Sequence, residues 1–203
     1  MISTPAPRTS SAAGNLILFL IVLVTYFFGL VGDVVAQDIA EAPQWTVGSW
    51  WRFEGHEAGN KVDFRRTLSK IDESGNYIIL IGTRVRYTHT DLNVADNPLR
   101  QWFRWPLKAG DSWTQEVLAP SRYGMRPEKM RFTVNQEWVA VPAGNFRAFR
   151  IYMVMTDLLD RRWSRRMWYA PEVRHWVKWD GYYGNGDFEY RLKEYHLAPA
   201  PSP

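Results

Sequence analysis

The chain has 203 residues and a net charge of +4, with 11 tryptophans, 10 tyrosines, 10 phenylalanines and no cysteine. The absence of cysteine excludes disulfides, thiolate zinc sites and a lipid-anchored cysteine. After residue 36, the remaining length is that of one domain. High aromatic content, glycine and proline punctuation and no long helical periodicity predict an all-β fold.

Residues 1–36 are typical of an export signal. Arg8 precedes an apolar run over 16–32, and Val34-Val35-Ala36 before Gln37 fits a signal peptidase site. We therefore expect a periplasmic protein. The run of 17 residues is also at the lower limit of a membrane span. The alternative is an uncleaved anchor that holds the chain in the inner membrane, facing the periplasm.

Several strands are expected along the body, over 43–53, 62–71, 77–89, 161–169, 175–179 and 188–197. Polar residues at 72–76 and the glycine-rich stretch 181–186 predict turns, while 91–98 and 119–127 predict loops. The apolar phase of the last strand flips near Glu194, which indicates a β-bulge. Residues 198–203 predict an extended, mobile tail.

The most definite prediction is a hairpin over 131–155, turning through a three-residue loop, Pro142-Ala143-Gly144. If Val141 pairs with Asn145, alternation gives a core face made of Phe132, Val134, Trp138, Phe146, Tyr152 and Val154. The returning strand is apolar on its other face as well, at Phe149, Ile151, Met153 and Met155, which predicts a place near the middle of the sheet. Trp138 is expected to anchor the core.

Together these elements predict one all-β domain over 37–197, a mainly antiparallel curled sheet or partly open barrel of roughly eight to ten strands. Three segments resemble an uncharacterised family of exported bacterial all-β domains. They are the strand start Gly110 to Trp113, the turn Val141-Pro-Ala-Gly-Asn-Phe146, and Trp168-Tyr-Ala-Pro-Glu-Val173 followed by Val177-Lys178. The resemblance implies a periplasmic antiparallel sheet and no established reaction. Arg174-His175 departs from the small residues expected there.

Catalytic and metal-binding motifs are absent from the sequence. It has no nucleophile elbow, no zinc-protease helix and no phosphate-binding glycine loop, and no two histidines have the spacing of a metal pair. We expect no catalytic residue, no metal and no cofactor. Glu137 lies among apolar residues, and a cross-strand ion pair with Arg147 is the simplest interpretation.

The densest charge cluster combines Arg161, Arg162, Arg165 and Arg166 with Trp163. On a strand, Arg162 and Arg166 share one side, and the other three residues share the opposite side. One interpretation of this arrangement is contact with an anionic lipid, an acidic glycan or an envelope protein. The alternative is an edge strand whose charges block pairing with other sheets. Nucleic acid is not expected as a partner of an exported chain.

Tryptophans are too numerous for one small core to bury completely. Trp163, Trp168, Trp176 and Trp179 are candidates for an aromatic groove. Gln136 and Arg150, opposite one another in the predicted hairpin, are its polar candidates. The alternative is that most of these rings are partly buried at the rim of the sheet. The favoured hypothesis is a non-enzymatic binding or envelope-assembly module, and the alternative is an envelope glycan or lipid hydrolase with dispersed carboxylates.

Overall fold

A computed structural model describes residues 39–88, 91–93, 101–121, 124–156, 161–183 and 186–200. All of them belong to the unit Asp38–Pro203. The expected export signal lies outside the described residues. Within these ranges, no helix has the length and apolar character needed to cross a membrane.

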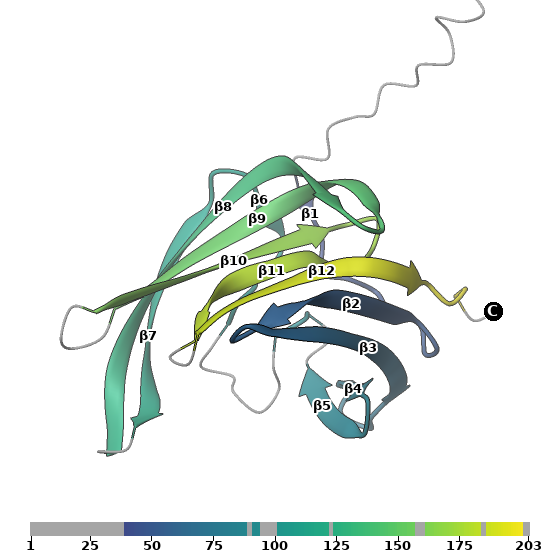
Figure 1. Cartoon of the computed structure of the whole chain (residues 1–203), viewed down its shortest axis with the longest axis horizontal. Coiled ribbons are helices and arrows are strands. Elements are labelled where there is room, and N and C mark those ends of the chain that lie inside the picture. Colours follow the sequence, from purple (N-terminus) through teal and green to yellow (C-terminus); the bar gives the residue numbers. More distant parts are fainter. Residues whose placement is uncertain are drawn as a thin grey trace, which may run out of the picture. The chain divides into compact units, whose positions relative to one another are not determined.

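Ten antiparallel strands form one sheet in the order β5-β4-β3-β2-β12-β11-β10-β9-β8-β7 (Figure 1). Their bounds are β2 Trp50–Glu57, β3 Asn60–Ile71, β4 Tyr77–Ile81, β5 Arg84–Thr88, β7 Ser112–Ser121, β8 Gly124–Val141, β9 Gly144–Thr156, β10 Arg162–Ala170, β11 His175–Tyr183 and β12 Gly186–His196. The all-β, antiparallel prediction is confirmed. The sheet is open, with β5 and β7 as its two edges.

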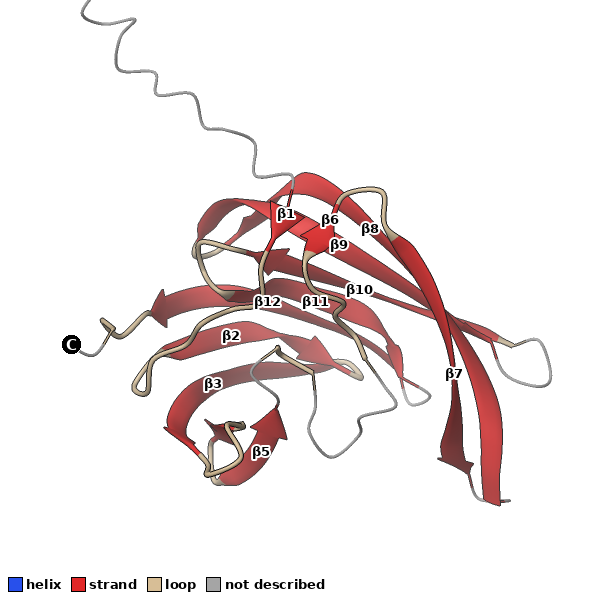
Figure 2. Cartoon of the chain, turned by 180° about the vertical axis from the view of Figure 1, so that it is seen from behind, coloured by secondary structure: helices blue, strands red, loops and turns tan. Residues whose placement is uncertain are grey.

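The two faces of this curved sheet differ. On its inner face lies a second, two-stranded sheet of β1 (Ile39–Ala40) and β6 (Leu107–Lys108) (Figure 2). The inner face carries the core, whose largest fully buried side chains are Trp51, Tyr169, Phe53, Phe132, Phe149, Phe188, Leu68 and Ile79. A Cβ on Gly55 would lie 1.8 Å from the carbonyl oxygen of Glu189, so only glycine permits this close approach of β2 to β12.

The β8–β9 hairpin forms as predicted, but its register is one residue different. Val141 pairs with Gly144 rather than with Asn145, so the turn has two residues. Because side chains alternate, this slip places Ile151 and Met153 opposite Val134 and Phe132 on the inner face. Tyr152 and Val154, which we expected in the core, lie half-buried on the outer face.

Trp138 is not a core anchor. It is 70% exposed, although it alternates in phase with the buried Phe132. At the hairpin tip the opposite side packs inward: Phe146 is buried and Val139 packs partly against the core. The amide of Ala143 donates to the carbonyl of Leu192 in β12, 3.0 Å away, and this bond holds the tip in place.

The loop predicted at 119–127 is instead the end of a long strand pair, since Leu118 pairs with Pro127 and Pro120 with Met125. Proline is tolerated there because β7 is an edge strand and β8 begins to pair with β9 only at Lys129. The bulge predicted near Glu194 is confirmed by a register shift between Leu192 and Glu194. In the expected tail, the amide of Ala198 donates to the Ser49 hydroxyl, 3.0 Å away.

Candidate functional site

An unbroken series of aromatic rings crosses the inner face from β3 to β7, and we call it the aromatic row. Its members are Phe64, Tyr190, Trp179, Trp102, Phe132 and Trp113. Successive ring centroids lie 5.3, 6.0, 6.1, 6.0 and 4.8 Å apart. Five rings come from strands, and Trp102 comes from the segment before β6. Edge-to-face contacts at these distances add to the energy of burial.

The aromatic row is not sealed from solvent. Phe64, Trp102 and Trp179 are only partly buried, whereas Phe132 is fully buried. Two aliphatic side chains, Val62 and Ile81, are also partly buried against the same core. The inner face therefore presents a strip of accessible aromatic and aliphatic surface.

Two arginines lie over rings on this face. The Arg165 guanidinium is 5.7 Å from the centroid of Trp102, and the Arg66 guanidinium is 5.7 Å from that of Trp176. The Trp176 ring is buried and lies 5.6 Å from Trp179 in the aromatic row. Each guanidinium is thus within cation–π distance of the aromatic cluster.

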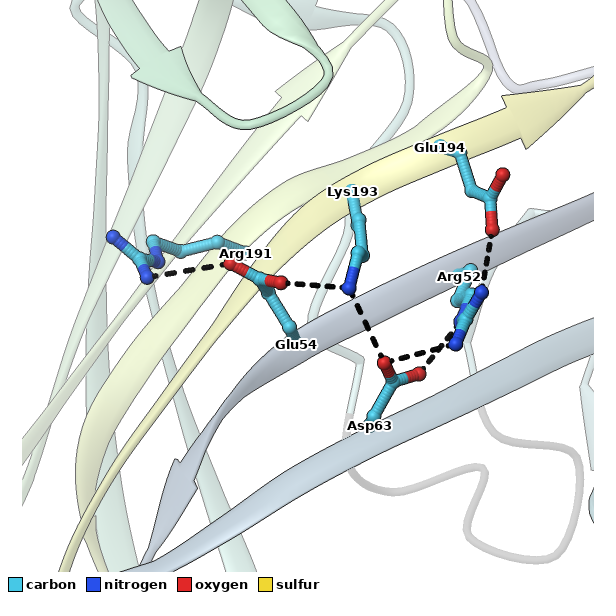
Figure 3. Close-up of polar contacts among 6 residues, drawn as sticks. All are labelled: Arg52, Glu54, Asp63, Arg191, Lys193 and Glu194. Carbon is cyan, nitrogen blue, oxygen red and sulfur yellow. Dashed lines mark hydrogen bonds and ion pairs between the residues drawn. The ribbon is translucent and has the colours of Figure 1, made fainter.

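The outer face has a different organisation, a continuous series of ion pairs from β10 to β3 that we call the ionic row. In order, its members are Arg166, Asp180, Lys178, Glu189, Arg191, Glu54, Lys193, Asp63, Arg52 and Glu194. Figure 3 shows the six residues at its β2–β3 end. The row contains equal numbers of acidic and basic groups, so it is electrically neutral.

Hydrogen bonds shift the pKa values of several members of the ionic row. The hydrogen bonds from Arg52 hold the pKa of Asp63 below its usual range, and those from Arg52 to Asp63 and Glu194 raise the pKa of Arg52. Likewise, the hydrogen bonds to Asp180 raise the pKa of Arg166, with N–O distances of 2.7 and 3.1 Å. A hydrogen bond from an oppositely charged group favours the charged forms of Asp63, Arg52 and Arg166.

A polar hollow of about 410 Å³ opens on the outer face beside the ionic row, and its walls are Arg150, Tyr152, Ser164, Arg166, Asp180 and Gly181. A neighbouring hollow shares Ser164, Arg166, Asp180 and Gly181 with it and extends to Glu189. Arg166 and Asp180 pair with each other across its wall. Its charged groups are therefore largely satisfied within the protein.

The four tryptophans predicted to form one groove do not share a face. Trp176 and Trp179 lie on the inner face. Trp168 is buried on the outer face, where its indole N–H donates to Glu137, 2.7 Å away. Trp163 alternates with the inner face at the start of β10 and is partly buried, 5.5 Å from the Arg161 guanidinium.

The polar candidates are also separated by the register of the hairpin. Arg150 pairs in register with Asn135 on the outer face, whereas Gln136 lies opposite Phe149 on the inner face. The prediction that Gln136 and Arg150 oppose one another was therefore wrong. Glu137 forms a structural ion pair with Arg150, 3.2 Å away, and also accepts the Trp168 bond.

The arginine cluster is divided between the two faces, as strand alternation predicts. Arg166, and in phase with it Arg162, lies on the outer face, and Arg165 lies on the inner face. The alternative interpretation, a charged edge strand, was wrong, because β10 is hydrogen-bonded to β9 and to β11. Contact of this cluster with an anionic partner stays a prediction.

Sequence reasoning missed His175, which is fully buried beside Trp45, Trp51, Phe53 and Trp176. Its Nδ1 lies 3.0 Å from the Trp176 carbonyl oxygen, so Nδ1 carries the ring proton and donates it. Burial lowers the pKa of His175 well below its ordinary value of 6.5. The only sequence signal was the departure at Arg174-His175, where Arg174 has a φ of 56°.

Comparisons with known proteins give a distant structural likeness. No family model matches the chain, and no curated protein does. Similar solved structures include an exported protein with YmcC-like fold from Bacteroides fragilis, at 12% identity over 77% of this chain and 99% of that one, with a TM-score of 0.40. A lipoprotein from Parabacteroides distasonis matches at 15% over 79% and 100%, with a TM-score of 0.39. The lipoprotein YmcC of Escherichia coli matches at 15% over 96% and 100%, with a TM-score of 0.45. At such low identities and TM-scores, no functional conclusion follows from the likeness.

Proposed function

We propose that the chain is a non-enzymatic binding module of the cell envelope, exported through residues 1–36, that holds the apolar chain of a lipid along the aromatic row. The observation that carries this proposal is the partial exposure of Phe64, Trp102 and Trp179 on the face that also forms the core. Large aromatic side chains left accessible there are characteristic of apolar ligand sites.

An acyl chain suits this strip better than a sugar does. Sugars stack on the open face of an aromatic ring, but guanidinium groups lie over Trp102 and Trp176. Neighbouring rings meet largely edge to face, with 71° between the planes of Trp102 and Trp179. The adjacent accessible side chains, Val62 and Ile81, are aliphatic and offer a sugar no hydrogen bonds.

The outer hollow supports an alternative, a hydrolase acting through Asp180 and Glu189. These carboxylates are register partners on β11 and β12. Lys178 Nζ lies 3.7 Å from Asp180 and 3.0 Å from Glu189. A glycoside hydrolase needs one of its two carboxylates protonated. Lys178 bridges Asp180 and Glu189, and Arg166 also pairs with Asp180, so both carboxylates already serve in structural ion pairs, and we prefer the binding module.

The test combines identification of a ligand with its localisation. Native mass spectrometry of protein purified from cells should detect a retained lipid. Titration with N-phenyl-1-naphthylamine, an uncharged apolar fluorophore, should give saturable binding that lipid displaces. Trp179→Gln should weaken probe binding by about tenfold, equivalent to about 1.4 kcal/mol. Trp138→Gln, a change in an exposed ring at the hairpin tip, should leave binding unchanged.

Three results would count against the lipid module. One is the absence of both a retained lipid and saturable probe binding. A retained glycan would identify a different ligand class. Hydrolysis of envelope glycan or lipid that Asp180→Asn abolishes, with probe binding intact, would instead support the hydrolase.

A further inference from the structure

Arg66 lies on the inner face without a charge partner among the described residues. It is partly buried in β3, and its Nε is shielded from solvent with no hydrogen-bond partner. No described carboxylate forms an ion pair with it, and its guanidinium lies 5.7 Å from the centroid of the Trp176 ring. A desolvated charge costs free energy unless it is paired, and a ring face compensates only part of that cost.

A second arginine reinforces this charge. Arg86 in β5 pairs in register with Ile79, which pairs with Leu68 in β3, so Arg86 and Arg66 alternate onto the same face. Burial, and then the charge of Arg86, lowers the pKa of Arg66 to about 10. No described carboxylate pairs with Arg86 either. Two like charges act on one another there without a described acidic group between them.

This end of the sheet contrasts with the ionic row directly behind it. On β3, Asp63 faces outward and is paired with both Arg52 and Lys193. Arg65 also faces outward, with its guanidinium 3.7 Å from the Trp50 ring. The outward-facing Asp63 therefore has two basic partners, whereas the inward-facing guanidinium of Arg66 has no acidic partner within the described part of the chain.

We propose that Arg66 and Arg86 form an anion site that holds the carboxylate or phosphate head of the lipid whose chain lies on the aromatic row. The extension to a lipid head rests on the proposed function. Guanidinium groups suit this role because their N–H groups match carboxylate and phosphate oxygens. The anion site adjoins the aromatic row, because Arg66 lies over Trp176, and Trp176 contacts Trp179 of that row. One ligand therefore reaches both sites with its head and its chain.

Chain-matched ligands test the anion site. Calorimetry would compare dodecanoate, dodecyl phosphate and uncharged dodecanol below their aggregation concentrations. We expect the anionic ligands to bind about tenfold tighter than dodecanol, because only an anionic head accepts a charge-assisted hydrogen bond from the guanidinium. Arg66→Gln should abolish that preference while leaving dodecanol binding unchanged. Arg65→Gln is the matched control, since it removes the adjacent outward-facing arginine and should preserve the preference.

A second readout uses the Arg66 Nε–H resonance, assigned by its loss in Arg66→Lys. Dodecanoate and inorganic phosphate should each shift this resonance in the full chain. Equal affinity for dodecanol and dodecanoate, or a preference that survives Arg66→Gln, would overturn the anion site and leave the lipid module standing. Binding of no amphiphile, with a shift by phosphate alone, would support the anion site and overturn the lipid module. Absence of any binding and any shift would overturn both.

Discussion

The outer and inner faces of the sheet are organised by different interactions. On the outer face, ten charged residues form a neutral series of ion pairs from β10 to β3. On the inner face, six rings form a series from β3 to β7, and the arginine beside it, Arg66, has no acidic partner among the described residues. Among the described residues, the members of the ionic row pair with one another, whereas the inner face combines partly exposed rings with Arg66, which has no acidic partner there. We therefore assign ligand binding to the inner face.

Neighbouring residues in one strand show this division most sharply. In β2, Trp51 is fully buried, while Trp50 faces outward beneath Arg65. In β3, Arg66 lies inward and Arg65 outward. Because successive side chains point to opposite faces, one position in the sequence decides between a core role and a surface role.

The largest expected effect is the difference in unfolding free energy between substitutions of the two tryptophans of β2. Trp51→Ala should lower the free energy of unfolding by about 3 to 5 kcal/mol, because it leaves a cavity among buried rings and removes the indole bond to the Val173 carbonyl. Trp50→Ala, which removes a partly exposed ring, should cost about 1 kcal/mol or less. Urea denaturation measures both. Equal losses would mean that the two faces are not divided as described.

As the pH falls, we expect the buried His175 to lower the free energy of unfolding before acid weakens the ion pairs of the ionic row. The folded-state pKa of His175 lies below its ordinary value of 6.5, so the unfolded chain binds the proton more readily. The contribution of the neutral His175 imidazole to the free energy of unfolding is therefore fully present above pH 6.5. It is lost as the pH drops below that value, by up to roughly 1.4 kcal/mol per pH unit.

The measurement is urea denaturation between pH 7 and pH 5, compared for the parent, His175→Gln and His56→Gln. His56 is an exposed histidine of β2 and serves as the control. The slope with pH should disappear in His175→Gln and persist in His56→Gln. A parent protein whose stability does not change over this range would contradict the buried, neutral imidazole.

Trp138 tests the exposed position of this side of the hairpin tip. Because this ring is 70% exposed, Trp138→Ala should change the free energy of unfolding by about 0.5 kcal/mol or less. Phe132→Ala, on the same strand but fully buried, is the matched comparison and should cost about 3 kcal/mol or more. A large loss from Trp138→Ala would contradict the exposed position of this ring at the hairpin tip.

The smallest effect is expected in the ionic row. Arg52 and Asp63 are both exposed, although two short hydrogen bonds join them. Exposed ion pairs couple weakly and are screened by salt. A double-mutant cycle of Arg52→Gln and Asp63→Asn should give a slight coupling at low salt that vanishes at about 1 M salt. A strong coupling that resists salt would show that the outer face contributes more to folding than we infer.

Fold class was predictable because aromatic content and turn residues are local signals. Most strand positions followed from alternation, as did the bulge near Glu194. The hairpin register was not predictable, because Pro142-Ala143-Gly144 fits both a two-residue and a three-residue turn, and the choice depends on packing of the tip against Leu192. The register difference of one residue reverses the two faces to which we had assigned the side chains of β9.

The candidate site was less predictable than the fold. Sequence alone could not show that β10 is central, and so the edge-strand interpretation of its arginines was reasonable but wrong. Trp176 and Trp179 were identified, but Phe64, Trp102 and Arg66 were not, because they come from distant segments that only the sheet order brings together. The lack of an acidic partner for Arg66 among the described residues could not be read from the sequence, because it depends on which segments lie beside Arg66 in the folded sheet.

The most direct test of inner-face binding is ¹⁹F NMR of protein labelled with 5-fluorotryptophan, with each of the 11 signals assigned by a single Trp→Phe substitution. Dodecanoate would be titrated into the full chain. Binding to the aromatic row should shift the signals of Trp102, Trp176 and Trp179 and leave those of Trp50, Trp138 and Trp168 in place. Shifts confined to Trp168 and Trp50, or the absence of any shift, would contradict the assignment of the inner face.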